Sequence, residues 1–286
     1  MPSRETAAPE TVPDSDAGLA AWLAERAGGL LLRLRTELGF GDPAALRDAG
    51  DKQSHELLMA AFATWRPGDA VLSEEGVDDK VRLAADRVWI VDPLDGTREY
   101  GEEGRTDWAV HVALWQRGHG LVAGAVALPA QGQVLSTDVP ELAAATPGPG
   151  AATPGPDAAT PGPGAAAPAG TDRPWRIATS RTRPPGFLPE TARELGAELV
   201  PMGSAGAKVC AVVQGTVDAY VHAGGQYEWD SAAPVAVALA TGHYASRLDG
   251  STLEYNQPDP RLPDLVVCRP ELAPRLLAAL NAGDKQ

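Results

Sequence analysis

Residues 87–97 read RVWIVDPLDGT, an apolar run that ends in two aspartates, Asp92 and Asp95. The apolar run predicts a buried strand, and the Pro and Gly residues after it predict a turn. Divalent cations such as Mg²⁺ are held by one or two carboxylates together with phosphate oxygens, and backbone N–H groups at a turn bind anions. The hexapeptide DPLDGT, residues 92–97, therefore offers both halves of a metal-assisted phosphate site. An ordinary acidic turn is the alternative for this stretch taken alone.

Two further acidic motifs favour the phosphate site. Ser73-Glu74-Glu75 lies upstream of the hexapeptide, and EWDSAAP, residues 228–234, lies downstream. In this order the three motifs resemble those of the lithium-sensitive, magnesium-dependent inositol monophosphatase superfamily, over residues 15–140 and 173–280. The haloacid-dehalogenase-type phosphatases also contain Leu-Asp-Gly-Thr, but their nucleophilic Asp is replaced here by Pro93. A phospho-aspartate mechanism is therefore not expected.

The resemblance implies an α+β fold, a layered α-β-α-β-α sandwich of the sugar/inositol phosphatase type, with two lobes and the metal site between them. We expect four regions along the chain. These are a disordered N-terminal tail at 1–14, a metal-binding α+β lobe at 15–139, a low-complexity Pro/Gly/Ala insert at 140–172 and an α/β substrate lobe at 173–286.

Hydrophobic periodicity places the helices and strands within these regions. We expect helices at 15–38, 52–66, 188–196, 204–214, 231–241 and 270–282. We expect strands at 70–72, 87–91, 109–115, 121–128, 175–179, 198–202, 218–222 and 264–268, the third and fourth forming a hairpin.

Composition excludes several classes of protein. The 286 residues carry a net charge of −14, which argues against general binding of nucleic acid polymers. The two cysteines, Cys210 and Cys268, lie in apolar runs and are expected to be buried and reduced. Because the sequence shows no secretory leader and no apolar stretch of 18 residues, we expect a cytoplasmic protein that does not bind membranes.

The resemblance also implies a set of metal ligands. The side-chain ligands are Glu74, Asp92, Asp95 and Asp230, the backbone carbonyl of Leu94 adds another, and two or three Mg²⁺ ions are expected. Two ions about 3.5–4 Å apart can activate water and neutralise a phosphoryl group. An N-cap role at a helix starting with residue 231 is the alternative for Asp230.

The catalytic residues are expected to be Glu74, Thr97 and Asp51. The family uses residues of the Glu74 and Thr97 types as a pair that orients the attacking water. Asp51 matches the family aspartate that supports a third, weaker metal, although capping of the helix at 52–66 would also explain it. His55 is expected to cap or pack, because Mg²⁺ prefers oxygen ligands.

Substrate contacts are expected from both lobes. Gly96 and Thr97 would cradle the phosphate with their N–H groups, beside Asp95 and Asp230. The helix start at Gly203 and Ser204 would meet the substrate from the second lobe. Lys208, one turn into that helix, is more typical of a structural residue.

Arg98 and Tyr227 bear on the choice of substrate. Arg98-Glu99 follows the hexapeptide and resembles the adenosine 3′,5′-bisphosphate phosphatases of the CysQ type. Arg98 would bind a second phosphate, and a surface ion pair with Glu102 or Glu103 is its alternative. Tyr227 would contact the base or sugar, or else pack in the core.

We therefore expect a magnesium-dependent phosphomonoesterase for a small phosphorylated substrate. The reaction expected is removal of the 3′-phosphate of adenosine 3′,5′-bisphosphate, and also of 3′-phosphoadenylyl sulfate, in sulfur assimilation. Inositol monophosphatase or fructose-1,6-bisphosphatase activity is the alternative within the superfamily, and a non-catalytic metal-dependent ligand sensor is the alternative outside enzymology. By analogy with the family, the chain is expected to be inhibited by lithium and to form a homodimer.

The heptad repeat of Ala, Thr, Pro and Gly at residues 145–165 yields a testable prediction. It has no hydrophobic face to bury. Deleting it should change stability by no more than about 0.5 kcal/mol, about 2 °C in melting temperature, and leave kcat unchanged. Calorimetry and a phosphate-release assay check this, and a large fall in either quantity would show that the repeat supports the fold.

Overall fold

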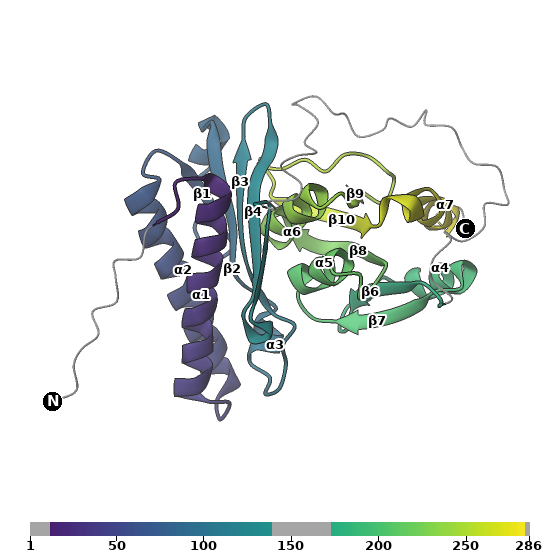
Figure 1. Ribbon diagram of the computed structural model, residues 1–286, viewed down its shortest axis with the longest axis horizontal. Coiled ribbons are helices and arrows are strands. Elements are labelled where there is room, and N and C mark those ends of the chain that lie inside the picture. The colour runs from purple at the N-terminus through teal and green to yellow at the C-terminus, as the bar shows by residue number, and fades with distance from the viewer. Residues whose placement is uncertain (1–11, 139–172, 284–286) are drawn as a thin grey trace.

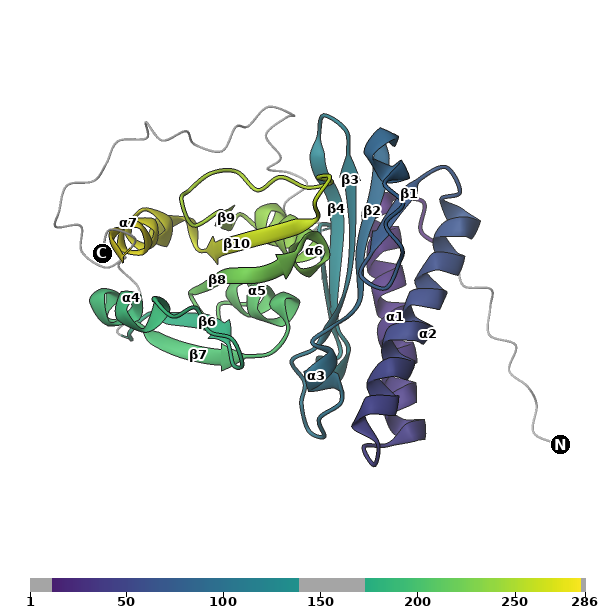
Figure 2. The same ribbon diagram turned by 180° about the vertical axis from the view of Figure 1, so that it is seen from behind.

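The computed structural model describes residues 12–138 and 173–283 and has five alternating layers of helix and sheet (Figure 1). Helices α1 and α2 form the first layer, and a sheet of five strands forms the second. Helices α5 and α6 lie between this sheet and a second five-stranded sheet, whose far side carries α4 and α7 (Figure 2). The predicted α-β-α-β-α sandwich is confirmed.

The first sheet has the strand order β1-β2-β3-β4-β5 and is antiparallel apart from the parallel pair β1 and β2. Its strands are β1 (Ala70–Ser73), β2 (Arg87–Asp95), β3 (Ala109–Gln116), β4 (Gly120–Leu128) and β5 (Gln133–Ser136). Helices α1 (Asp16–Leu38) and α2 (Pro43–Trp65) cover its outer face. Leu23, Leu58 and Trp89 are buried between helices and sheet, so apolar burial holds these two layers together.

The second sheet has the order β7-β6-β8-β10-β9. Its strands are β6 (Arg176–Ser180), β7 (Glu198–Met202), β8 (Ala219–Tyr227), β9 (Tyr244–Ser246) and β10 (Arg261–Cys268). Helices α4 (Leu188–Leu195) and α7 (Ala273–Gly283) lie on its outer face, where Ile177, Val221 and Leu276 are buried.

Helices α5 (Ala205–Val213) and α6 (Glu228–Ala240) join the two sheets through a shared central core. The closeness of this packing is visible at Gly124 of β4, where an added Cβ would lie 2.8 Å from the Cβ of Ala236. Four short helical turns complete the described fold: η1 (Val81–Ala84), α3 (Thr97–Tyr100), η2 (Pro129–Gln131) and η3 (Pro270–Leu272).

The predicted start of the second helix, at residue 52, is wrong. The helix begins at Pro43, and the Asp42 carboxylate caps it by accepting the N–H groups of Ala44 and Ala45. It continues through Gly50, whose missing side chain leaves room for Tyr100: an added Cβ would lie 2.7 Å from its ring. Asp51 is therefore inside the helix, and its alternative role as a cap is excluded.

Several other boundaries differ from the predictions. Strand β2 continues to Asp95 with a register shift at Pro93, which has no N–H to donate to β3. Strand β8 extends to Tyr227, and β10 begins at Arg261 rather than at residue 264. Strands β5 and β9 were not predicted, because each is only three or four residues long. The closing helix is divided between η3 and α7.

The start of the helix near Asp230 also differs from the predicted start at residue 231. Helix α6 begins at Glu228, so Asp230 is its third residue and not its N-cap. Its carboxylate accepts the N–H of Tyr227 at 2.6 Å, which satisfies the helix start from inside. Asp230 therefore satisfies a backbone N–H at the start of α6 although it lies inside the helix, and its side chain also lines the cavity described below.

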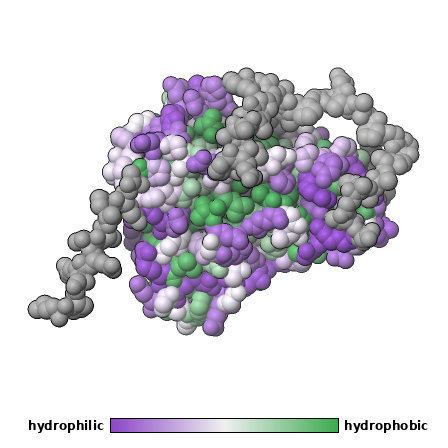
Figure 3. Space-filling model, in the orientation of Figure 1, coloured by the Kyte–Doolittle hydropathy of each residue, from purple (hydrophilic) through white to green (hydrophobic). Residues whose placement is uncertain are grey.

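The remaining expectations about the chain are partly outside the described residues. Cys210 and Cys268 are buried and free, as predicted. In the ranges 12–138 and 173–283, no helix combines the length and apolarity that crossing a bilayer requires. Apolar side chains gather near the middle of one face of the molecule, and its periphery is mostly hydrophilic (Figure 3). The disordered tail, apart from residues 12–14, and the insert at 140–172 fall in undescribed parts of the chain and remain predictions.

Candidate active site

A cavity of about 320 Å³ lies between the two sheets. The ends of β1 and β2 and the starts of α3, α5 and α6 converge on it. Strand ends and helix starts from both halves of the chain therefore meet at one place, where helix N–H groups favour anions. Its polar lining includes Glu74, Asp92, Asp95, Thr97, Arg98, Glu99, Ser180, Thr182, Arg183, Ser204, Lys208, His222, Gln226 and Asp230.

Three of the predicted metal ligands form a tight group in this cavity. One carboxylate oxygen each from Asp92, Asp95 and Asp230 lie within 4.8 Å of one another. Glu74 follows β1, which pairs in parallel with β2, so its carboxyl group reaches the same cavity beside Asp92. Glu75 does not line the cavity, as expected for the neighbouring residue of an extended chain. The structure thus brings the four predicted side-chain ligands together.

Asp95 is held by three groups through a single oxygen. Its Oδ2 accepts the Ser204 hydroxyl at 2.5 Å and the Gly206 N–H at 2.8 Å, and it lies 3.2 Å from Nε2 of His111. The second-lobe helix α5 is thereby tied to the end of β2. Because these contacts all use Oδ2, the other oxygen remains available to a ligand in the cavity.

His111 is a site residue that the sequence did not reveal. It lies on β3 opposite Asp92, is completely buried, and has Nδ1 3.0 Å from the carbonyl oxygen of Trp229. Burial disfavours the imidazolium, but the Asp95 charge outweighs it and raises the pKa of His111. In return, despite burial, the His111 charge lowers the pKa of Asp95. A lone histidine in a strand carries no motif, so only its position across the sheet could identify it.

The ion pair between Asp95 and His111 has room to form only because residue 206 is a glycine. An added Cβ at Gly206 would lie 2.1 Å from the His111 ring nitrogen, so any side chain there would displace the histidine. Gly206 is therefore required for the approach of α5 to β3.

The hexapeptide turn is held rigidly. Ser54 of α2 donates its hydroxyl to the Pro93 carbonyl at 2.7 Å, and the Leu94 N–H donates to Asp92 at 3.0 Å. Gly96 follows with φ of +83°, a conformation that favours glycine. The chain then turns into α3, whose first N–H groups have no partner within the helix.

Thr97 is held beside Asp51, and its pairing with Glu74 around a water stays a prediction. Its hydroxyl lies 3.0 Å from the Leu94 carbonyl and 3.4 Å from the Asp51 carboxylate, and no direct bond to Glu74 is found among the described residues. The helix that carries Asp51 packs beside the hexapeptide, which explains the pairing. His55, in the next turn of that helix, contacts the Ser73 hydroxyl at 3.0 Å and is not in the cavity.

The carboxylates of the site carry more negative charge than nearby cations offset. Desolvation, followed by the charges of neighbouring carboxylates, raises the pKa of Asp51, Glu74 and Asp230 each to about 7. The same two causes raise the pKa of the buried Asp92. A dense all-oxygen donor set with excess negative charge fits a hard divalent cation such as Mg²⁺.

The second lobe supplies the opposite wall. Ser204 caps α5 with φ of +42°, which L residues rarely adopt, and its hydroxyl is committed to Asp95. The Gly203 N–H donates to the Asp107 carboxylate at 2.6 Å. Lys208 is buried, donates to the carbonyls of Gly203 and Ser204, and has a pKa lowered to about 8 by desolvation. Gly203 and Ser204 therefore line the cavity with their own polar groups already engaged.

Two arginines face the cavity from opposite lobes. Arg98 is exposed on α3, and Arg183 follows β6. Within the described ranges neither has a carboxylate at ion-pair distance, and Glu102, an alternative partner for Arg98, instead binds Arg181 at 2.6 Å.

Tyr227 does not line the cavity: its ring stacks on Trp229, with centroids 4.7 Å apart, and is 36% exposed.

Comparison with known proteins defines the class. Residues 34–284 match the inositol monophosphatase family, and the chain belongs to it. The solved structure of inositol monophosphatase-II from Staphylococcus aureus MSSA476 has a TM-score of 0.69 with 22% identity, covering 93% of each chain.

The names of two curated relatives also state a substrate. The chain is 53% identical over 276 residues to the 3′-phosphoadenosine 5′-phosphate phosphatase of Mycobacterium leprae (strain TN), covering 93% of this chain and 94% of that one. It is 28% identical over 208 residues to the 3′(2′),5′-bisphosphate nucleotidase CysQ of Salmonella typhimurium (strain LT2), covering 72% and 78%. The resemblance drawn from the three motifs is confirmed.

The raised pKa values lead to a prediction about pH and metal. A carboxyl group whose pKa is higher in the folded than in the unfolded state contributes stability below its unfolded pKa and loses it as pH rises through its folded pKa. For Asp51, Glu74 and Asp230 this window runs from about 4 to about 7. Mg²⁺ should therefore raise the melting temperature more at pH 8 than at pH 5.5, because the ionised carboxylates bind it.

Asp92→Asn tests the source of that effect. The variant should lose most of the Mg²⁺ response, yet without metal at pH 8 it should be at least as stable as the native chain, because one buried charge is removed. Asp86→Asn, which removes an exposed carboxylate paired with Arg117, should keep the response. An equal Mg²⁺ effect at both pH values, or an unchanged effect in Asp92→Asn, would contradict the metal assignment.

Proposed function

We propose that this chain is a magnesium-dependent phosphomonoesterase that removes the 3′-phosphate of adenosine 3′,5′-bisphosphate. The observation that supports it most directly is one cavity that combines four converging carboxylates with Arg98 and Arg183, neither of which pairs with a carboxylate of the described residues. The names of the relatives at 53% and 28% identity point to the same substrate. 3′-Phosphoadenylyl sulfate carries the same 3′-phosphate and is included in the proposal, which would place the reaction in sulfur assimilation.

The metal ligands are proposed to be Glu74, Asp92, Asp95, Asp230 and the Leu94 carbonyl, holding two or three Mg²⁺ ions. Asp51 would support the third ion. When bound, the ions would neutralise the phosphoryl oxygens and lower the pKa of a coordinated water. We also propose that lithium inhibits the enzyme, as expected of the family.

The protein groups near the hexapeptide would position the reactants. The Thr97 hydroxyl, held by the Leu94 carbonyl and close to Asp51, is placed to orient the attacking water. Asp51, whose carboxylate lies 3.4 Å from the Thr97 hydroxyl, would help to hold that hydroxyl in position. The N–H groups of Gly96 and Thr97, at the start of α3, would hold the phosphate.

In this reaction the water oxygen attacks phosphorus, the bond from phosphorus to the 3′-oxygen breaks, and a proton from the water passes to the released 3′-oxygen. The products are adenosine 5′-phosphate and inorganic phosphate. Glu74 would share the orientation of the water with Thr97. Gly203 and Ser204 would fix the shape of the cavity wall, because their polar groups already bind Asp107 and Asp95.

The second phosphate would lie between Arg98 and Arg183. Most other arginines of the described residues bind carboxylates or carbonyls, for example Arg87, Arg117 and Arg247. Two guanidinium groups at one cavity, neither paired with a carboxylate of the described residues, therefore favour a second anionic group on the substrate. Tyr227 remains a proposed contact for the base or sugar only if its ring leaves Trp229.

Inositol 1-phosphate or fructose 1,6-bisphosphate is the alternative substrate within the superfamily. The fold of the Staphylococcus aureus enzyme does not discriminate, since a fold hosts many specificities. The intact carboxylate group and Thr97 argue against a non-catalytic sensor. A phosphate-release assay with Mg²⁺ over these three substrates ranks them, and no release from any of them would refute the enzyme proposal. A cytoplasmic location and a homodimer also remain proposals.

Arg98→Thr tests the specificity directly. The charge-assisted contact it removes should lower kcat/KM for adenosine 3′,5′-bisphosphate by about 10-fold or more and leave inositol 1-phosphate unaffected, because that substrate has one phosphate. Arg183→Thr should act in the same direction. Arg33→Thr, which removes an exposed arginine of α1 outside the cavity, is the control. Equal losses for both substrates would exclude a role for Arg98 in selecting the second phosphate.

A further inference from the structure

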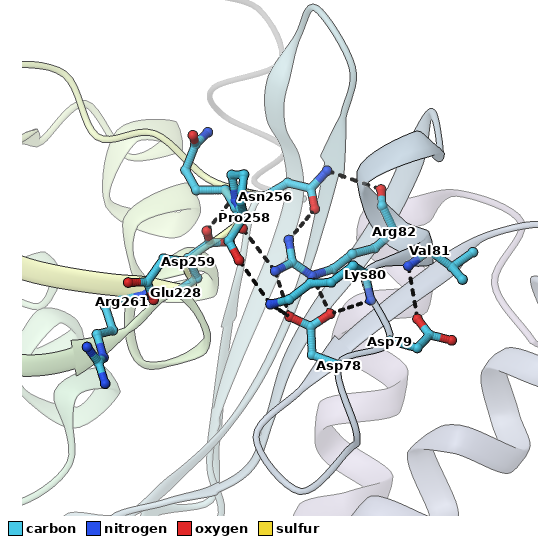
Figure 4. A network of polar contacts seen from close by, with 11 residues as sticks. Asp78, Asp79, Lys80, Val81, Arg82, Glu228, Asn256, Pro258, Asp259 and Arg261 are labelled. Atoms are coloured by element: carbon cyan, nitrogen blue, oxygen red, sulfur yellow. Dashed lines mark hydrogen bonds and ion pairs between the residues drawn. The ribbon is translucent and has the colours of Figure 1, made fainter.

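A largely buried polar network connects the segment between β1 and β2 with the start of α6 and the loop between β9 and β10 (Figure 4). We call it the seam network and define it by Asp78, Arg82, Glu228 and Asn256. Asp78 and Arg82 belong to the segment between β1 and β2, whereas Glu228 begins α6 and Asn256 lies between β9 and β10. Hydrogen bonds connect these four residues across 174 positions of sequence.

Arg82 is the centre of the network on the first lobe. Its side chain is 2% exposed, and its Nε and one terminal nitrogen donate to both oxygens of Asp78, at 3.0 and 2.8 Å. The other terminal nitrogen donates to the Asn256 side-chain oxygen at 2.8 Å, and the Gln257 carbonyl accepts at 2.9 Å. The guanidinium thus fixes the segment after β1 against the loop of the second lobe.

Glu228 continues the network into α6. It is 1% exposed, and its two carboxylate oxygens accept the N–H groups of Asn256 at 2.6 Å and Gln257 at 2.7 Å. Its own N–H donates to the Pro260 carbonyl at 2.8 Å. The first residue of α6 is therefore anchored to the same loop that Arg82 holds.

Both ends of the network are close in sequence to predicted metal ligands. Asp230 is two residues after Glu228, in the first turn of α6, and Glu74 is four residues before Asp78. The two ligands come from different lobes, and their carboxylates repel each other in the absence of a cation. Helix α6 packs on β2, β3 and β4 of the first sheet, and the seam network adds hydrogen bonds between the start of this helix and the segment that follows Glu74.

The backbone at Asn256 fits such a connection. Its φ is +61°, which Asn tolerates better than most residues, so that both its N–H and its side-chain oxygen can be used at once. The N–H binds Glu228 on one side and the side chain binds Arg82 on the other.

We propose that the seam network sets the position of Asp230 relative to Glu74 and thereby the affinity of the site for divalent metal. Arg82, Asn256 and Glu228 are positioning residues in this account, and none of them contacts the substrate. The inference rests on the proposed metal-dependent function, but not on the identity of the substrate. Groups that orient metal ligands typically change metal affinity by about 10- to 100-fold when removed.

The test measures the affinity of the full chain for Mn²⁺ alone. Electron paramagnetic resonance gives the concentration of unbound Mn²⁺ during the titration. Asn256→Gly removes the bond to Arg82 while allowing the positive φ, and should weaken Mn²⁺ binding about 10-fold. Arg247→Ala is the matched control, because it removes a partly buried ion pair with Asp264 in the second lobe, away from the site. It should lower the melting temperature and leave Mn²⁺ affinity unchanged.

Asn256→Asp separates positioning from general destabilisation. It keeps an oxygen that accepts from Arg82 and should retain native Mn²⁺ affinity. If Asn256→Gly does not fold, Arg82→Lys replaces it, since a lysine cannot bind Asp78 and Asn256 together as the guanidinium does. Unchanged affinity in Asn256→Gly or Arg82→Lys, an equal loss in Arg247→Ala, or a full loss in Asn256→Asp would overturn the proposal. Failure of the chain to hydrolyse adenosine 3′,5′-bisphosphate, with this Mn²⁺ pattern intact, would refute the substrate and leave the positioning role standing.

Discussion

The whole site depends on the attachment of Asp95 to the second lobe. One oxygen of this buried carboxylate accepts the Ser204 hydroxyl and the Gly206 N–H and faces the His111 ring. Burying a carboxylate is costly unless it is paired and hydrogen-bonded, and here all the compensating groups are on one side. The contacts therefore pull α5 against the end of β2 and leave the other Asp95 oxygen without a hydrogen bond from the described residues. The contacts that attach α5 to Asp95 therefore also orient the Asp95 carboxylate as a proposed metal ligand.

This arrangement gathers like charges on a framework of hydrogen bonds and packing. Asp95 keeps its ionised form through His111, whereas desolvation and mutual repulsion raise the pKa of Asp92 and, to about 7, that of Asp230. The energetic cost of assembling these groups is carried by the fold: the central core under α6, the Ser54 bond to the hexapeptide turn, and the seam network at the opposite edge. A divalent cation bound here would relieve the repulsion among these carboxylates.

The sequence predicted the parts of this design that lie in continuous motifs. Asp92 and Asp95 share one turn, and the order of the three motifs sufficed for Glu74, Asp230 and the five-layer fold. It could not predict His111 or the pairing of Thr97 with Asp51, because these depend on which strands and helices become neighbours. The start of α2 was missed because Gly50 reads as a helix breaker, whereas here it makes space for Tyr100. From the sequence Arg82 also resembles an ordinary surface arginine. Its burial depends on the loop that contains Asn256, which is far away in the sequence.

The most direct test is phosphate release from adenosine 3′,5′-bisphosphate by Asp95→Asn at saturating Mg²⁺, with circular dichroism recorded at the assay temperature. The account predicts a folded protein with a lower melting temperature, since His111 loses its counter-ion. Turnover should fall by at least about 100-fold, as when a group that stabilises transition-state charge is removed. A folded Asp95→Asn protein with near-native turnover would contradict the account, because neither the metal site nor the junction of the lobes would then depend on this carboxylate.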